Sequence, residues 1–169
     1  QYVDTVFDAL SRAETSADLN ELRLELEEQG YLKRSKGKQK PPAPSAPMEF
    51  LSDDGFRILI GRNNLENDRL TLKIAKGSDI WLHVKSFAGS HTVILTEGKI
   101  PPDRTVEQAA ILAATHSKAS ASKQVPVDYT AARYVKKPSD AKPGRVIYTD
   151  NRTAFVDPDP MLAERLRVK

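Results

Sequence analysis

The sequence predicts an α+β fold, in which a helical hairpin precedes a mixed, largely antiparallel sheet with two main helices. From residue 48 onward, short strand patterns occur in pairs that are separated by two helical patterns, and a run of turn-linked strands follows. The sequence contains neither Gly-x-Gly-x-x-Gly nor Gly-x-x-x-x-Gly-Lys. Both motifs cradle phosphates in parallel-sheet proteins, so a doubly wound nucleotide-binding fold is not expected.

The first 32 residues predict two helices. Apolar side chains recur at helical spacing between residues 2 and 13, and Thr15 with Asp18 forms a capping box that starts a second helix. The expected apolar face of this second helix consists of Leu19, Leu22 and Leu26. Two short helices do not reveal their partner, so the hairpin is either the end of a longer coiled coil or a cap on the following domain.

Residues 33–48 predict a basic, proline-rich linker. Five of the eight residues from 33 to 40 are basic, and four of the seven from 41 to 47 are proline. Like charges repel and proline extends the backbone, so we expect a solvated tether, with contact to phosphates as the alternative role. The expected organisation is a hairpin (1–32), this linker (33–48), an α+β domain (49–160) and a C-terminal tail (161–169).

The elements of the domain follow from turn residues and periodicity. Asp-Gly at 54–55 marks a tight hairpin, and Asn63 or Asn64 can cap the first main helix. Thr105 and Gln108 predict a capping box at the second. The expected strands are 50–51, 56–60, 79–85, 91–95, 125–135, 145–149 and 153–156, and the first helix is 65–75.

The charge of the chain is unevenly distributed. Residues 1–32 carry a net charge of −6, whereas the whole chain carries +3, so the remainder carries +9. A basic surface attracts polyanions because each neutralised phosphate releases a counterion, although lysine-rich surfaces also serve solubility alone.

Other compositional features bound the location of the protein. The sequence has no cysteine, and its longest apolar run, residues 109–114, is too short to span a bilayer. It shows no basic-then-apolar leader, and it begins at Gln1 rather than Met, so we expect a longer parent protein in the cytoplasm.

The segment Asp79–Lys85 is expected to present two different faces. In a strand, Asp79, Trp81, His83 and Lys85 share one face, while the intervening aliphatic residues share the other. An exposed row of aromatic and cationic groups suits base stacking and phosphate binding. The alternative is that Trp81 is a core residue beneath a helix and His83 is its hydrogen-bonded neighbour.

The side taken by His91 depends on the turn between the two strands. Regular pairing of Lys85 with Ser90 would send His91 to the aliphatic face, whereas a bulge at Gly89 would bring it to the side of Trp81. Gly89 and Ser90 also suggest a small anion-binding nest, which needs the conformational freedom of glycine.

An enzymatic role is not expected. A zinc site made of His83, His91 and His116, or a water activated by a histidine and Asp79, is the enzymatic alternative. The histidine spacing matches no metal signature, and no nucleophile motif such as Gly-x-Ser-x-Gly occurs. We therefore expect neither a cofactor nor a metal.

A series of short motifs across residues 49–158 resembles the NFACT-R domain. They occur in the family's order: Gly61-Arg-Asn-Asn64, Asn67-Asp68, Leu70-Thr71, Asp79-Ile-Trp-Leu-His83, Gly89-Ser-His91, Ser117-Lys118, Val127-Asp-Tyr-Thr130, Val135-Lys-Lys-Pro138, Lys142-Pro-Gly144 and Val146-Ile-Tyr148. Thr92 departs from the valine that is usual after Gly-Ser-His. The helical hairpin also resembles the end of the coiled coil that precedes this domain in bacterial members of the family.

The resemblance implies an RNA-binding module of a ribosome-associated quality control protein. Such proteins bind the large ribosomal subunit and recruit tRNA for template-free tailing of stalled nascent chains, so the expected partners are tRNA, large-subunit rRNA and the ribosome. The alternative is a surface adhesin domain that binds fibronectin, as reported for some Gram-positive members. The residues expected to bind nucleic acid are Arg62, Asn63, Asn64, Asp79, Trp81, His83, Lys85, Gly89, Ser90, His91, Ser117, Lys118, Lys136 and Lys137.

Overall fold

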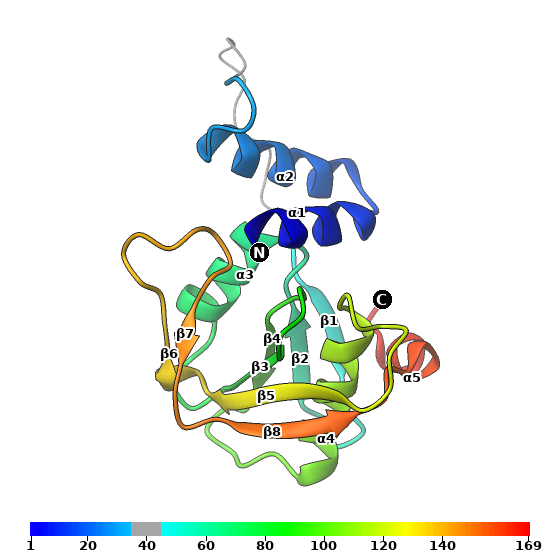
Figure 1. Cartoon of the computed structure of the whole chain (residues 1–169). Coiled ribbons are helices and arrows are strands. Elements are labelled where there is room, and N and C mark those ends of the chain that lie inside the picture. Colours follow the sequence, from blue (N-terminus) through cyan, green and yellow to red (C-terminus); the bar gives the residue numbers. More distant parts are fainter. Residues whose placement is uncertain (35–44) are drawn as a thin grey trace.

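A twisted antiparallel sheet forms the body of the protein. The computed structural model describes residues 1–34 and 45–169, so most of the predicted linker, residues 35–44, lies outside the described residues. Within the described part, six strands pair in the order β1-β2-β4-β3-β5-β8, and β5 and β8 run across the direction of β1 and β2 (Figure 1). The strands are β1 (Met48–Leu51), β2 (Arg57–Ile60), β3 (Ile80–Val84), β4 (Thr92–Leu95), β5 (Val125–Ala131) and β8 (Arg152–Val156).

The predicted fold class is confirmed by this arrangement. Every pairing described between neighbouring strands is antiparallel, so the sheet has no parallel component in this part of the chain. The Asp-Gly hairpin also forms as predicted, since Gly55 adopts a φ of +86° between β1 and β2.

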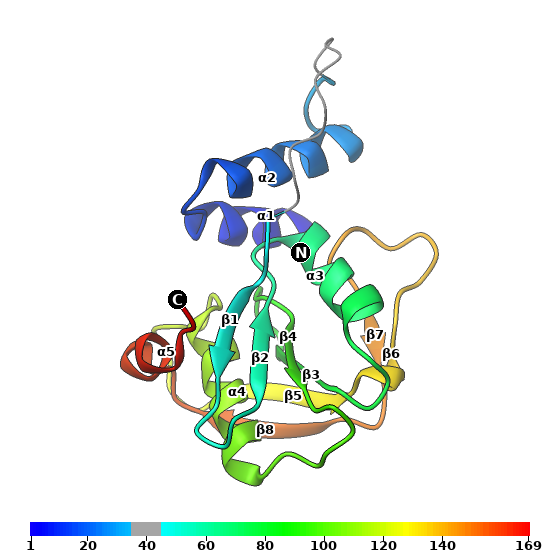
Figure 2. The ribbon, with the colours of Figure 1, turned by 180° about the vertical axis from the view of Figure 1, so that it is seen from behind.

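One face of the sheet is covered by helix α4 (Asp103–Thr115). The helix lies on β3, β4, β5 and β8, and its small side chains, such as Ala109 and Ala113, allow close approach to the aliphatic residues Leu82 and Val84. Helix α5 (Pro160–Leu166) packs beside α4 and β1, so the predicted C-terminal tail contains a helix (Figure 2). The aliphatic face expected for the 79–85 segment therefore lies in the main core.

The opposite face of the sheet carries a smaller core. Helix α3 (Asn64–Arg69) continues into a π-helical turn, η1 (Leu70–Ile74), and buried Trp81 packs with Leu70 and Val135. The strand predicted for 125–135 is interrupted by a 3-10 turn, η2 (Ala132–Tyr134). The chain then forms a short hairpin of β6 (Val135–Lys136) and β7 (Ile147–Tyr148).

Two helix starts agree with prediction and one does not. Asn63 caps α3 by accepting a hydrogen bond from the Glu66 amide, and the capping box of Thr15 is present. The predicted capping box at Thr105 is wrong because α4 begins two residues earlier, at Asp103. The Thr105 hydroxyl instead lies 2.9 Å from the Ser52 hydroxyl, which ties α4 to the first hairpin.

The N-terminal helices, α1 (Tyr2–Ser11) and α2 (Ser16–Glu28), pack on the α3 side of the domain (Figure 1). The predicted leucine face is only partly right, since Leu22 is buried but Leu19 is 50% exposed. The buried polar residues of α2 are Asp18, Glu21 and Glu25, because the surface of α3 that they meet is itself polar. None of the helices within residues 1–34 and 45–169 has the length and apolar character needed to cross a bilayer.

Asp79 stabilises the start of β3, and we predict that Asp79→Ala destabilises the fold. Its buried carboxylate accepts hydrogen bonds from the amides of Lys76 and Thr96, at 2.8 and 2.9 Å, and from the Thr96 hydroxyl. Removing it leaves buried donors unpaired, which should lower the free energy of unfolding by about 2–3 kcal/mol. Urea denaturation followed by circular dichroism tests this, with exposed Asp140→Ala as the control. Equal stability of the two variants would contradict the assignment.

Candidate nucleic-acid interface

A cavity of about 970 Å³ opens on the Trp81 side of the sheet. Three segments form its walls: the start of α1, the turn at residues 86–89, and the segment 138–148 that contains β7. Its volume is at the upper end of the range of small-molecule sites. The side chains that line it include Trp81, His83, Phe87, His91, Lys118 and Tyr148.

The floor of the cavity is held by a chain of hydrogen bonds. The Trp81 indole N–H donates to the Thr71 hydroxyl oxygen (3.1 Å), and that oxygen lies 2.6 Å from His91 Nδ1. His91 Nε2 lies 2.9 Å from the carbonyl oxygen of Gly144, which can only accept a hydrogen bond. His91 is therefore the neutral tautomer with its proton on Nε2, and the Thr71 hydroxyl donates to Nδ1.

The register of β3 and β4 places His91 beside Trp81. Trp81 pairs with Val93, and Leu82 pairs with Thr92. The regular pairing considered from the sequence places Lys85 opposite Ser90, and the observed register is shifted from it by one residue. His91 therefore lies on the aromatic face of β3 and not on the aliphatic one. Its ring packs edge-on against Trp81, with centroids 5.3 Å apart.

Burial of the two histidines keeps them neutral. Burial is the main cause that lowers the pKa of His91 to about 3, and nearby His83 adds to the effect. Burial also lowers the pKa of His83, against a smaller opposing effect of the backbone at Val84 and Gly89. The His83 ring is half-buried and parallel to Trp81 within 8°, with centroids 6.0 Å apart.

Trp81 itself is a core residue. Its side chain is 1% exposed, so the expectation of an open aromatic and cationic row along β3 is wrong for this residue. Tyr148, which the sequence prediction does not include, packs on Trp81 with centroids 4.8 Å apart. Its hydroxyl donates to Asp128 (2.6 Å), and burial with this hydrogen bond raises the pKa of Tyr148. The η1 turn and Tyr148 together keep water from the indole.

Several cations surround the cavity. Lys118 lies 3.3 Å from Asp4 in an exposed ion pair, and Lys142 places its ammonium 4.7 Å from the ring centroid of Tyr2. Arg145 is exposed and forms no ion pair within the described residues. Exposed ion pairs contribute little to stability, so the side chain of Lys118 can turn to a ligand at small cost.

Three predicted lysines lie outside the cavity lining. Lys85 and Lys136 are exposed. Lys137 instead stabilises the 137–146 loop, because its ammonium lies 3.1 Å from Asp68 and donates to the carbonyl oxygen of Lys142 (2.8 Å). The cations Lys142 and Arg145 are missing from the sequence prediction, although Lys142 lies in a motif that carries the family resemblance.

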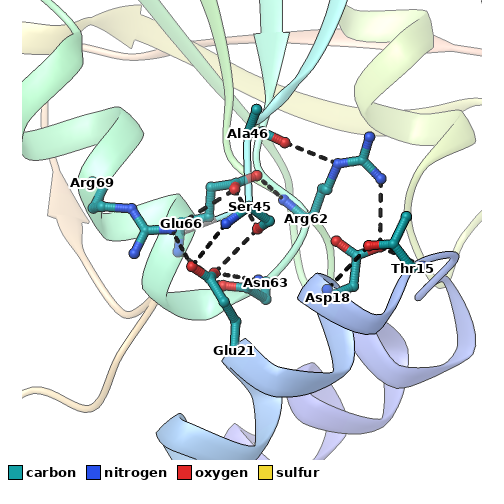
Figure 3. Close-up of polar contacts among 9 residues, drawn as sticks. All are labelled: Thr15, Asp18, Glu21, Ser45, Ala46, Arg62, Asn63, Glu66 and Arg69. Atoms are coloured by element: carbon teal, nitrogen blue, oxygen red, sulfur yellow. Dashed lines mark hydrogen bonds and ion pairs between the residues drawn. The ribbon is translucent and has the colours of Figure 1, made fainter. Parts of the chain in front are cut away.

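Arg62, Asn63 and Asn64 position the helical hairpin. The Asn63 side chain donates to Glu21 (2.8 Å), and Arg62 pairs with Asp18 at 3.5 Å (Figure 3). Asn64 donates to Glu25 (2.8 Å) at the same interface and also lines the cavity. The expectation that Arg62 and Asn63 lie at the nucleic-acid site is not supported by their positions.

Buried carboxylates concentrate at this junction. Glu66 accepts a hydrogen bond from the Ser45 hydroxyl (2.7 Å), and Arg69 pairs with Glu21 at 2.7 Å (Figure 3). Burial raises the pKa values of Glu66 and Glu25, more than their hydrogen bonds lower them. One oxygen of Glu25 is buried without a hydrogen-bond partner in the described part of the protein.

Four other predicted residues stabilise the fold. Asp79, Ser90 and Ser117 are buried. The backbone of Gly89 pairs with Ser117, and a side chain at this position would collide with Val84. Gly89 does not have the positive φ expected for an anion nest. Glycine is needed at position 89 so that the backbone can lie close to Val84 and Ser117.

The structure does not bring the three histidines together. His83 and His91 adjoin, with ring centroids 5.7 Å apart, whereas His116 packs on Phe50 and its Nδ1 lies 2.8 Å from the Leu112 carbonyl oxygen. Among the described residues, no group of three His, Asp or Glu side chains is placed to hold a metal ion.

We predict that His91→Gln weakens the pH dependence of stability. The unfolded chain has a histidine pKa near 6.5, whereas the fold lowers the pKa of His91 to about 3. Between these values the unfolded state binds more protons, so the free energy of unfolding falls as pH decreases, by up to about 1.4 kcal/mol per pH unit from this group. Glutamine can still donate to the Gly144 carbonyl.

Urea denaturation at pH 7, 6 and 5 measures this effect. Carboxyl groups with raised pKa values, such as Glu25 and Glu66, act in the opposite direction. They are common to both proteins, so the difference between wild type and variant isolates His91. Identical pH slopes for the two proteins would contradict a buried neutral His91.

The chain is similar to a known protein family and to known relatives. Residues 47–150 match the family described as the NFACT protein RNA binding domain. The chain is 46% identical over 163 residues to the Rqc2 homolog RqcH of Bacillus subtilis (strain 168), and 42% identical over 158 residues to the Rqc2 homolog RqcH of Streptococcus suis (strain 05ZYH33). These alignments cover 94% and 93% of this chain but 28% of each relative.

A solved structure shares the fold across almost the whole chain. It is the C-terminal part of the fibronectin/fibrinogen-binding protein from Streptococcus suis, which is 40% identical with a TM-score of 0.90. The match covers 99% of this chain and 66% of that chain. The family match extends over more than half of the residues, and the motifs that line the cavity lie within it. The chain therefore belongs to the family of NFACT protein RNA-binding domains.

Proposed function

We propose that this chain is an RNA-binding module that contacts tRNA or large-subunit rRNA through the cavity and its cationic rim. The observation that carries the proposal is the position of Lys118, Lys142 and Arg145 around a cavity with an aromatic floor. Cationic side chains attract the phosphate backbone, and aromatic rings offer surfaces for bases. The family description of an RNA binding domain supports the same function.

The charge distribution supports this assignment of the surface. Residues 1–32 carry −6 and the remainder +9, so the cations concentrate outside the helical hairpin. At the hairpin, acidic residues such as Glu21 and Glu25 are buried against α3. The start of α1 still contributes Tyr2 and Thr5 to the cavity wall. Four of its eight acidic residues are buried, whereas Asp4 lines the cavity and pairs with Lys118.

The names of the similar proteins support a proposal for the wider role. The similar proteins are named Rqc2 homolog RqcH, and the chain spans less than a third of their length. We place the module in ribosome-associated quality control, where it supports tailing of stalled nascent chains in the cytoplasm. We propose that it acts there by binding and not as an enzyme, and this is supported by the structural hydrogen bonds that engage both nitrogens of His91 and the hydroxyl of Tyr148.

We predict that Lys118→Gln with Arg145→Gln weakens RNA binding several-fold. Each lost phosphate contact should also reduce the slope of log K against log salt by about 1. Both side chains are exposed, so the variant should fold normally. The control is Lys99→Gln with Lys123→Gln, which removes the same charge from two exposed positions that do not line the cavity.

Fluorescence anisotropy with labelled tRNA and an rRNA fragment, at several salt concentrations, measures the effect. An equal loss in the two double variants would place the RNA surface elsewhere. Fibronectin is titrated in parallel, because the Streptococcus suis protein of the solved structure is named for binding it. Strong fibronectin binding without RNA binding would favour the adhesin role instead.

A further inference from the structure

The cavity contains one ring whose polar atoms are not engaged by other side chains. Trp81 donates to Thr71, both nitrogens of His91 have partners, and Tyr148 donates to Asp128. His83 lies among them, but its ring is half-buried, and no hydrogen bond joins it to another side chain in the described part of the chain. His83 is therefore the one polar ring of the floor without a side-chain hydrogen-bond partner among the described residues, and its polar contacts are with the backbone at Val84 and Gly89.

A second aromatic ring in the lining of the same cavity, that of Phe87, is exposed rather than half-buried. Phe87 lies on the turn between β3 and β4 and is 43% exposed, although it is a large apolar side chain. The preceding residue, Ser86, has a φ of +64°, which is costly for a residue with a side chain. A single exposed phenylalanine is common on protein surfaces. Here it coincides with a cavity, a half-buried imidazole and a strained turn.

The neutral rings and the cations of the cavity lie at different depths. Because burial lowers the pKa of His83, its imidazole is neutral near pH 7, so it offers a flat ring without a charge. The cations Lys118 and Arg145 are exposed and line the same cavity. Neutral rings within and cations outside match a nucleotide, whose base is flat and neutral and whose phosphate is charged.

From this arrangement we infer that the cavity holds one unstacked base of single-stranded RNA against His83 and Phe87, with the flanking phosphates at Lys118 and Arg145. The inference rests on the proposed function and names the part of the RNA that enters. Bases in a duplex are already stacked and paired, so a single strand is the form that fits. Stacking tolerates every base, which predicts weak sequence preference.

The test compares two ligands with equal charge. One is a fluorescein-labelled octamer of uridylate, and the other is an octamer of abasic ribose phosphate, which keeps the phosphates and lacks every base. Wild type should bind the uridylate more tightly by about 5- to 150-fold, the equivalent of one stacked base. Phe87→Ala should remove most of this difference without changing the salt dependence, and Phe87→Tyr should restore it.

His83→Ala is the second variant, although it also loses packing against Trp81. The exposed Phe87 therefore provides the safer measurement, and Phe155→Ala is its matched control. Phe155 lies on β8, is 63% exposed and does not line the cavity. The control should bind both octamers as wild type does.

The outcomes separate the two proposals. If wild type binds RNA but Phe87→Ala and His83→Ala retain the full preference for uridylate, base stacking at this cavity is wrong while RNA binding stands. Equal losses of affinity for the two octamers in these variants would also overturn base stacking at this cavity, because they would show a loss of phosphate contacts only. If wild type binds neither octamer nor tRNA, the proposed function fails and the inference fails with it.

Discussion

The imidazole of His91 is the point at which three separate segments of the chain meet. It accepts a hydrogen bond from Thr71 on the η1 turn, donates to the carbonyl of Gly144 on the 137–146 loop, and packs against Trp81 on β3. A buried polar network is stable only when each member is satisfied, so none of the three segments can move alone. The floor and one wall of the cavity are consequences of this constraint.

Gly144 shows how closely the loop must approach. Its φ of +80° and its contact with Asn64 leave no room for a side chain, and its amide donates to Asp68. Asn64 in turn donates to Glu25 on the helical hairpin. The hairpin, α3 and the loop are thus joined by polar groups rather than by an apolar core. Burying the carboxylates of this junction costs solvation free energy, which their hydrogen bonds offset in part.

The side chains around the cavity fall into two groups with different consequences. Trp81, His91 and Tyr148 are held by hydrogen bonds and packing, so they form a rigid floor. Phe87 and Arg145 are exposed at its edge. A rigid floor limits the conformational entropy lost when a ligand binds, while the exposed groups can adjust to a flexible strand. This division is suited to the proposed binding of a flexible RNA strand.

Local patterns in the sequence determined the fold class, the first hairpin, the cap at Asn63 and the aliphatic face of β3, because each depends on neighbouring residues or on strand alternation. The family resemblance also followed from short motifs. Only the tertiary structure decided that Trp81 is buried, that His91 lies beside it, and that Arg62 and Asn63 meet the helical hairpin. A one-residue change of register moves a side chain to the other face of a sheet. Burial depends on segments that are distant in the chain. Neither the strand register nor the burial of a side chain can therefore be predicted from local spacing.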